Sequence, residues 1–256
     1  MVWPPHRLAR TRQYSKDVIR FVVLGPDSGN FANKLEEVLL EPFLLWVRTT
    51  TGQWWAGRSY EAISGALQMV LPVKEDSVLG APIPIVRTKN MPFDVSAITD
   101  SIWKDLWEKT VRGSRPRISD VLLSDCAYQA YCEEWRTAII LANCAIESAR
   151  DEMLCSHSLS MKNFSKNRTD LLKHLGKDLK SLFGISFAEV SSEESREFIK
   201  SLWITRGEAS HGRELRWREG NDWKSVKSLS ERRFLGSLRT VIQTIRSFEM
   251  RATLQR

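Results

Sequence analysis

The sequence predicts a chain in two parts, an α+β domain over residues 1–115 followed by an all-α helical bundle over residues 120–254. Three observations support this prediction. Up to about residue 112, short apolar runs alternate with Gly and Pro, as in strands joined by turns. After about residue 125, apolar residues recur every three or four positions, as on one face of a helix. The segment RGSRPRISD between them, residues 112–120, is typical of a domain boundary.

The first part is expected to contain three strands and two helices. The strands are the apolar runs DVIRFVVLG at 17–25, FLLWVRT at 43–49 and PIPIVR at 82–87. Helical stretches are expected near 31–41 and 97–110. This half contains no motif that points to a particular chemistry, so its role as a possible sensor or substrate guide rests on analogy alone.

The second part is expected to be a bundle of four amphipathic helices. The first runs from about 124 to 155, and the second covers 167–183 and stops at Gly184. The third begins with a capping box, in which Ser191 is followed three residues later by Glu194. The fourth covers about 230–251, with one apolar face along its length.

Charge points to a polyanionic partner. The chain has 38 Lys and Arg against 31 Asp and Glu, and 20 of these bases against 14 of the acids lie in residues 151–256. The start of the chain lacks a signal peptide's apolar stretch, and no apolar run approaches the length of a membrane helix, so we expect a cytoplasmic protein without membrane contact. The basic half is therefore where nucleic acid is expected to bind.

No cofactor or metal is expected. The four cysteines follow no CxxC spacing, which argues against a zinc site and a disulfide framework, and we expect them to be reduced. The stretch LGPDSGN at 24–30 has two glycines but lacks the lysine and the spacing of a phosphate-binding loop.

The residues that could perform chemistry follow the third helix. Arg206 and His211 are separated by four residues, and Gly212 is positioned to end the helix directly after the histidine. On an unbroken helix five residues rotate by about 140° and rise about 7.5 Å, so the two side chains would not share a face. They can converge only if the last turn unwinds or if a symmetry mate supplies the partner, as in a twofold dimer packed along this helix end.

This arrangement resembles the HEPN superfamily, particularly its Apea-like branch. The resemblance rests on Arg206, His211 and Gly212, and on residues 122–154, which look like the family's long first helix with its acidic position at Glu147. It covers residues 120–251. Family members usually carry Asn, Asp or His directly after the arginine, whereas this chain has Gly207.

The resemblance implies a metal-independent endoribonuclease that acts as a homodimer, as in prokaryotic toxins or defence effectors with an antitoxin or regulatory partner. In that family role, His211 is the general base or acid, Arg206 holds the phosphate, and Glu208 orients the site. The residue types suit this chemistry, because neutral imidazole can remove a proton from a ribose 2′-hydroxyl and guanidinium can offset the developing charge.

A basic connector at 213–233 follows this constellation and is the expected RNA-binding segment. Its bases would follow phosphates while Trp217 or Trp223 stacks on a nucleobase. The candidate RNA-binding residues are Arg213, Arg216, Trp217, Arg218, Lys224 and Lys227. The alternative is a solvated loop without a ligand.

Other interpretations stay open at this point. Arg206 and His211 could be residues at a helix end with no chemical role, and Glu147 could be a solvated or ion-paired glutamate. The second functional hypothesis is a non-catalytic HEPN-like module that binds RNA or a protein partner. A third is DNA binding driven by net charge.

Overall fold

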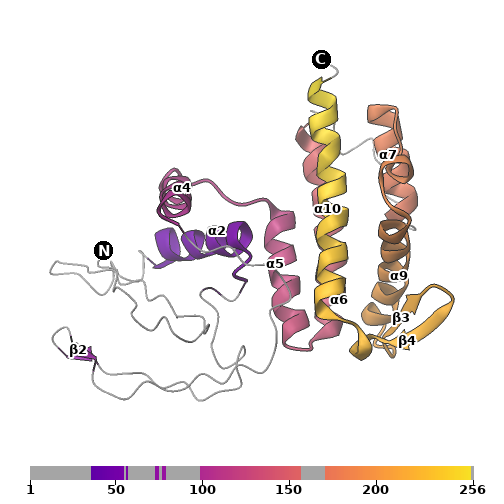
Figure 1. Ribbon diagram of the computed structural model, residues 1–256, viewed down its shortest axis with the longest axis horizontal. Helices are drawn as coiled ribbons and strands as arrows, with labels where there is room; N and C mark the ends of the chain where they lie inside the picture. Colours follow the sequence, from indigo (N-terminus) through magenta and orange to yellow (C-terminus); the bar gives the residue numbers. More distant parts are fainter. Residues whose placement is uncertain are drawn as a thin grey trace. The chain divides into compact units, whose positions relative to one another are not determined.

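The computed structural model describes residues 36–54, 56, 73–74, 77–78, 99–156 and 171–254, and these ranges are mostly helical (Figure 1). Two compact units, Met1–Pro42 and Phe43–Arg256, make up the chain, and the second contains the helical bundle. Among the described helices, none is both long and apolar enough to cross a lipid bilayer.

The strand expected at 43–49 is wrong, because these residues belong to helix α2 (Glu41–Thr51). Phe43 and Val47, four residues apart, are both buried, which is the spacing of a helix face and not of a strand. The ring of Phe43 packs edge-on against Trp103 of helix α4, with centroids 4.6 Å apart. Continuous apolar runs of this length do not distinguish a strand from a buried helix, and the tertiary packing decides.

The helix expected near 97–110 is confirmed as α4 (Asp100–Val111), where Thr99 caps the first turn by accepting a hydrogen bond from the Ile102 amide. The end of the expected helix 31–41 is described as the π-helix η1 (Glu36–Leu40) and the start of α2. Strands β1 (Val73–Lys74) and β2 (Ser77–Val78) pair in an antiparallel ladder. The strands expected at 17–25 and 82–87 lie outside the described residues.

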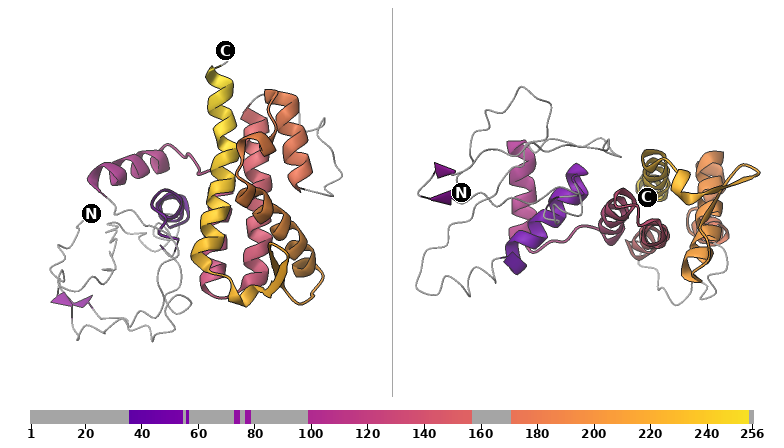
Figure 2. Two further views of the ribbon diagram at one scale, coloured as in Figure 1. Left: turned by 45° about the vertical axis from the view of Figure 1, so that its right-hand side comes forward. Right: turned by 90° about the horizontal axis from the view of Figure 1, so that it is seen from below.

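Helices from α5 onward form a bundle (Figure 2). Its helices are α5 (Ile118–Tyr131), α6 (Trp135–Ser156), α7 (Leu171–Phe183), α8 (Phe187–Val190), α9 (Glu193–Ser210) and α10 (Glu231–Leu254). Residues 112–117, within the segment expected to separate two domains, contain no regular element. The division of the chain at this place stays a prediction.

The single helix expected over 124–155 is instead a pair, α5 and α6. The break lies at residues 132–134, where Glu133 adopts a φ of 64° and closes the turn. Neither Pro nor Gly marks this turn in the sequence, and the apolar spacing continues across it. The two helices therefore pack against each other along small buried residues such as Ala127, Ala130 and Ala142.

The ends of α9 follow from its capping residues. Ser192, one residue after the expected Ser191, is the N-cap and accepts a hydrogen bond from the Ser195 amide at 3.1 Å. At the other end Gly212 has a φ of 69°, and Gly184 ends α7 in the same way with a φ of 70°. These left-handed residues confirm both predicted helix stops.

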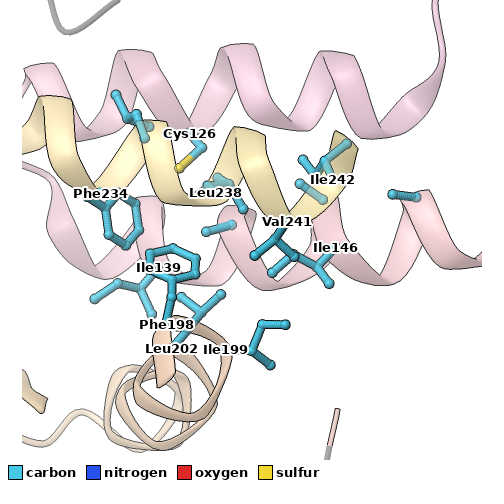
Figure 3. Packing of buried hydrophobic residues seen from close by; sticks show 14 of the residues in the cluster. Cys126, Ile139, Ile146, Phe198, Ile199, Leu202, Phe234, Leu238, Val241 and Ile242 are labelled. Carbon is cyan, nitrogen blue, oxygen red and sulfur yellow. The ribbon is translucent and has the colours of Figure 1, made fainter. Parts of the chain in front are cut away.

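The core of the bundle lies between α5, α6, α9 and α10 (Figure 3). Its fully buried side chains include Ile139 and Ile146 of α6, Ile199 of α9 and Leu238 of α10. The four cysteines are free thiols, as expected, and burial raises the pKa of the Cys126 thiol well above its ordinary value. The apolar stripes predicted from the sequence are thus core residues.

The bundle is not purely helical, which corrects the expectation of an all-α domain. Between α9 and α10, the expected connector folds into an antiparallel hairpin of β3 (Arg216–Glu219) and β4 (Asp222–Ser225), followed by the 3-10 turn η3 (Val226–Ser228). Gly220 opens the two-residue loop with a φ of 63°, which favours glycine. Figure 1 shows this hairpin at the end of α9 that carries His211.

Candidate functional site

Arg206 and His211 lie on different faces of α9. The helix continues to Ser210, and the His211 amide donates to the Gly207 carbonyl at 3.2 Å, so the last turn does not unwind. The two side chains therefore keep the separation of about 140° that a regular helix gives five residues. Two arrangements could bring the side chains together, an unwound last turn or a second copy of the chain. The last turn is helical, so within these alternatives convergence would need a second copy.

The guanidinium of Arg206 lies on an aromatic ring. Its Cζ atom is 5.1 Å from the centroid of the Trp203 ring, a cation–π contact between residues three apart on the helix. In the described part of the chain, no carboxylate pairs with this guanidinium. Its positive charge is therefore held in place while its N–H groups stay available to an anion.

The turn that carries His211 is anchored by Arg136 of α6. One guanidinium nitrogen donates to the Ala209 carbonyl at 2.5 Å, and the other donates to the Arg213 carbonyl at 2.8 Å. These bonds satisfy carbonyls at the helix C-terminus, where a positive charge is also favoured. His211 itself is exposed between these two anchored carbonyls. Sequence reasoning missed Arg136, because nothing in its local sequence signals a partner more than seventy residues away.

Glu208 bonds to the hairpin within this chain, and its predicted role of orienting the site stays a prediction. Its carboxylate is buried on the side of the hairpin, where it accepts hydrogen bonds from the Arg216 backbone amide at 2.9 Å and from the Arg216 guanidinium at 2.7 Å. Each residue of a helix turns by about 100°, so Glu208, two positions after Arg206, points about 160° away from it. Glu208 therefore positions strand β3.

Two further side chains of α9 also form hydrogen bonds to the hairpin, in this case as donors. Ser201 donates to the Arg218 carbonyl at 2.8 Å, and Thr205 donates to the Arg216 carbonyl at 2.7 Å. Together with Glu208, these residues recur at helical spacing on one buried face of α9. The hairpin is thereby fixed to the helix that ends at His211.

The predicted RNA-binding residues differ in their exposure. Trp217 is 7% exposed and packs against Phe198 and Phe234, so its ring is part of the core and is not available to a nucleobase. Trp223 is 45% exposed, and the Arg216 guanidinium lies over its ring at 5.3 Å. Trp223 is therefore the aromatic residue of this hairpin that could stack on a base.

The basic side chains divide into paired and unpaired groups. Arg216 pairs with Glu208, Lys224 pairs with Glu219 at 2.5 Å, and Arg218 donates to the Gly220 carbonyl. In the described part of the chain, Arg213 and Lys227 have exposed side chains without a carboxylate partner. These two, with Arg206, are the bases most accessible to phosphate.

Glu147 is buried in α6, away from the end of α9. Its carboxylate accepts a hydrogen bond from the Asn143 amide at 3.1 Å. It lies eleven positions after Arg136, which corresponds to about 16 Å along the helix. The structure therefore does not bring Glu147 to the turn of His211, and its interactions are those of a buried, hydrogen-bonded carboxylate.

A hollow of about 370 Å³ lies between the first half of α9, the hairpin and the start of α10. Phe198, Trp217 and Phe234 line its floor. Its charged lining residues are Glu194, Glu197, Glu219, Arg218, Lys224 and Arg233. Because acids and bases balance, this hollow does not favour an anion, in contrast to the end of α9.

Among the described residues, no group of His, Cys, Asp and Glu has the arrangement of a metal site. No family model matches the chain, and neither a curated protein nor a solved structure with significant similarity was found. The resemblance to the HEPN superfamily thus stays an inference from Arg206, His211 and Gly212 and their place in the chain.

Proposed function

We propose that this protein is a metal-independent endoribonuclease whose reaction takes place at the end of α9. The observation that supports the proposal is that the end of α9 carries both an exposed imidazole, His211, and a guanidinium, Arg206, that has no carboxylate partner in the described part of the chain. Arg136 and the hairpin hold the turn of His211 in place. A fixed base and an unneutralised cation suit phosphodiester chemistry where a second copy brings them together.

The proposed reaction uses the ribose as its own nucleophile. Neutral His211 removes the proton of the 2′-hydroxyl, and the resulting oxyanion attacks the adjacent phosphorus. The bond from phosphorus to the 5′-oxygen breaks, and a proton passes to this leaving oxygen. Arg206 stabilises the added charge on the phosphoryl oxygens. The products are a 2′,3′-cyclic phosphate and a 5′-hydroxyl, and DNA is inert because it has no 2′-hydroxyl.

A homodimer completes the proposed site. Because Arg206 and His211 lie on different faces of one helix, the base from one protomer and the guanidinium from its partner would meet in a shared cleft. Such an activity suits a toxin or defence effector, and an antitoxin or regulatory protein that covers the cleft would restrain it.

The direct test is cleavage of single-stranded RNA by the wild type and by His211→Ala. We expect cyclic-phosphate ends from the wild type and at least a hundredfold less cleavage by the variant, in line with the loss of a general base. Arg112→Ala is the control, since this exposed arginine directly follows α4 and pairs with Glu108. Equal cleavage by His211→Ala would remove His211 from the mechanism.

A second candidate function is a non-catalytic module that binds RNA. The exposed Trp223 with Arg216 over its ring, and the unpaired Arg213 and Lys227, favour it, because stacking and phosphate contacts need no general base. Equal RNA binding by the wild type and His211→Ala, with cleavage by neither, would support this function over the nuclease.

A further inference from the structure

Gly207 occupies a position where the chain itself does not need glycine. It lies inside α9, and its φ is not among the positive values found for the chain's turn glycines. A Cβ atom added there would meet nothing within 4 Å. Because glycine is among the poorest helix formers, its presence weakens α9 without relieving any contact inside the chain.

The residues one turn away on either side of Gly207 are large and accessible. Trp203 precedes it by four residues and His211 follows it by four, so the three lie on successive turns of one face. Ile204, beside them, is 38% exposed. Gly207 therefore leaves bare backbone between an indole ring and an imidazole, which we call the Gly207 notch.

The charge around the Gly207 notch favours a polyanion. Arg206 is half-buried and has no carboxylate partner in the described part of the chain, whereas Lys200 pairs with Glu197 at 2.6 Å and Glu208 is buried against the hairpin. Arg206 is held over Trp203 at one side of the notch. A phosphate chain would be attracted to this positive charge.

We infer that the Gly207 notch is where single-stranded RNA crosses α9, with the absent side chain making room for the ribose and phosphate of the nucleotide next to His211. This inference rests on the proposed function and adds the path of the substrate to it. Gly207 is in this account a positioning residue, since it makes no bond in the reaction. Trp203 and Arg206 would contact the same strand from one side of the notch.

Gly207→Ala tests the inference, with Gly236→Ala of α10 as the matched control. Both glycines lie inside long helices and have open space where a Cβ would be added. Both variants should raise the melting temperature, by about 2–4 °C, because alanine favours the helix. Only Gly207→Ala should weaken binding of a single-stranded RNA that carries a 2′-O-methyl group at each ribose, by at least tenfold, and raise KM for cleavable RNA.

The other outcomes separate this inference from the proposed function. Unchanged binding and cleavage by Gly207→Ala would overturn the inference and leave the nuclease proposal intact. A wild type that binds RNA without cleaving it, combined with weakened binding by Gly207→Ala, would support the notch and contradict the nuclease. A fall in melting temperature, or a shift from dimer to monomer in light scattering, would assign Gly207 to the fold or to a contact between copies and would overturn the inference.

Discussion

At the scale of single residues, the carboxylate of Glu208 is the group on which the junction of α9 and the hairpin depends. It is buried and accepts hydrogen bonds from both the backbone amide and the guanidinium of Arg216. A buried charge is tolerated only where such partners replace water. Glu208, two positions after Arg206 within the expected motif, thus stabilises the fold beside the site.

Arg216→Ala should therefore lower the free energy of unfolding by about 1–3 kcal/mol, because it leaves the Glu208 carboxylate with only the backbone amide as a partner. Chemical denaturation measures this change. Arg213→Ala is the control, since its side chain is exposed and its loss should stay within about 0.5 kcal/mol. Equal stability of the two variants would contradict the role of Glu208.

Trp217 and Glu208 also show how far single residues can be predicted. Arg206, His211 and Gly212 stand where the sequence indicates, at the end of a helix, because helix stops depend on local backbone preferences. The burial of Trp217 and the pairing of Glu208 depend on the hairpin, whose strands are too short to show a pattern in the sequence.

At the scale of elements, Arg136 joins α6 to the end of α9. Its guanidinium donates to the Ala209 and Arg213 carbonyls on either side of His211. Arg136→Ala would leave these carbonyls to water and release the turn. Hydrogen exchange should then speed up for amides of residues 210–215 and stay unchanged in the core of α10. Arg136→Lys should restore the protection only in part, because lysine lacks the planar fork.

The hairpin carries a pH-sensitive pair of contacts. Glu219 accepts hydrogen bonds from Lys224 and Arg233, and the Lys224 ammonium and the Arg233 guanidinium lower the pKa of Glu219 below its usual range. A carboxylate with a lowered pKa in the folded state stabilises the fold above its ordinary pKa, and this contribution is lost as the pH falls through the lowered value.

Lys224→Met should accordingly raise the pKa of Glu219 toward its ordinary value, because the largest cause of the shift is removed. Carbon-detected NMR of the Glu219 carboxyl between about pH 2 and pH 7 measures both values. Glu197 is the internal reference, because its pKa is lowered chiefly by the hydrogen bond from Lys200 and Lys224 is not among the causes. An unchanged Glu219 titration would show that Lys224 does not hold it in solution.

Elements were predictable where one strong local signal decided them. The stops of α7 and α9 follow from glycines with positive φ, and α4 follows from the helical stretch expected near 97–110. The break between α5 and α6 is not predictable, because Glu133 adopts a left-handed conformation that nothing in the neighbouring sequence indicates. The apolar run at 43–49 became α2 because Phe43 packs against the aromatic face of α4.

At the scale of the whole molecule, the proposed mechanism requires two copies of the chain. Within the basic half of the chain, Arg206, Arg213 and Lys227 lie exposed or half-buried without carboxylate partners among the described residues. One protomer offers His211 and Arg206 on different faces, so a monomer lacks a complete site. Cleavage should therefore depend on dimer formation.

A mixed dimer tests this claim most directly. The Arg206→Ala chain and the His211→Ala chain each retain the residue that the other lacks. The two chains are co-expressed with different tags, and the mixed dimer is purified through both tags. If protomers share the site, the mixed dimer has one intact site of two and should cleave RNA at about half the wild-type rate, while each homodimer is inactive. A mixed dimer as inactive as its parents, beside a wild type that cleaves, would contradict the shared site.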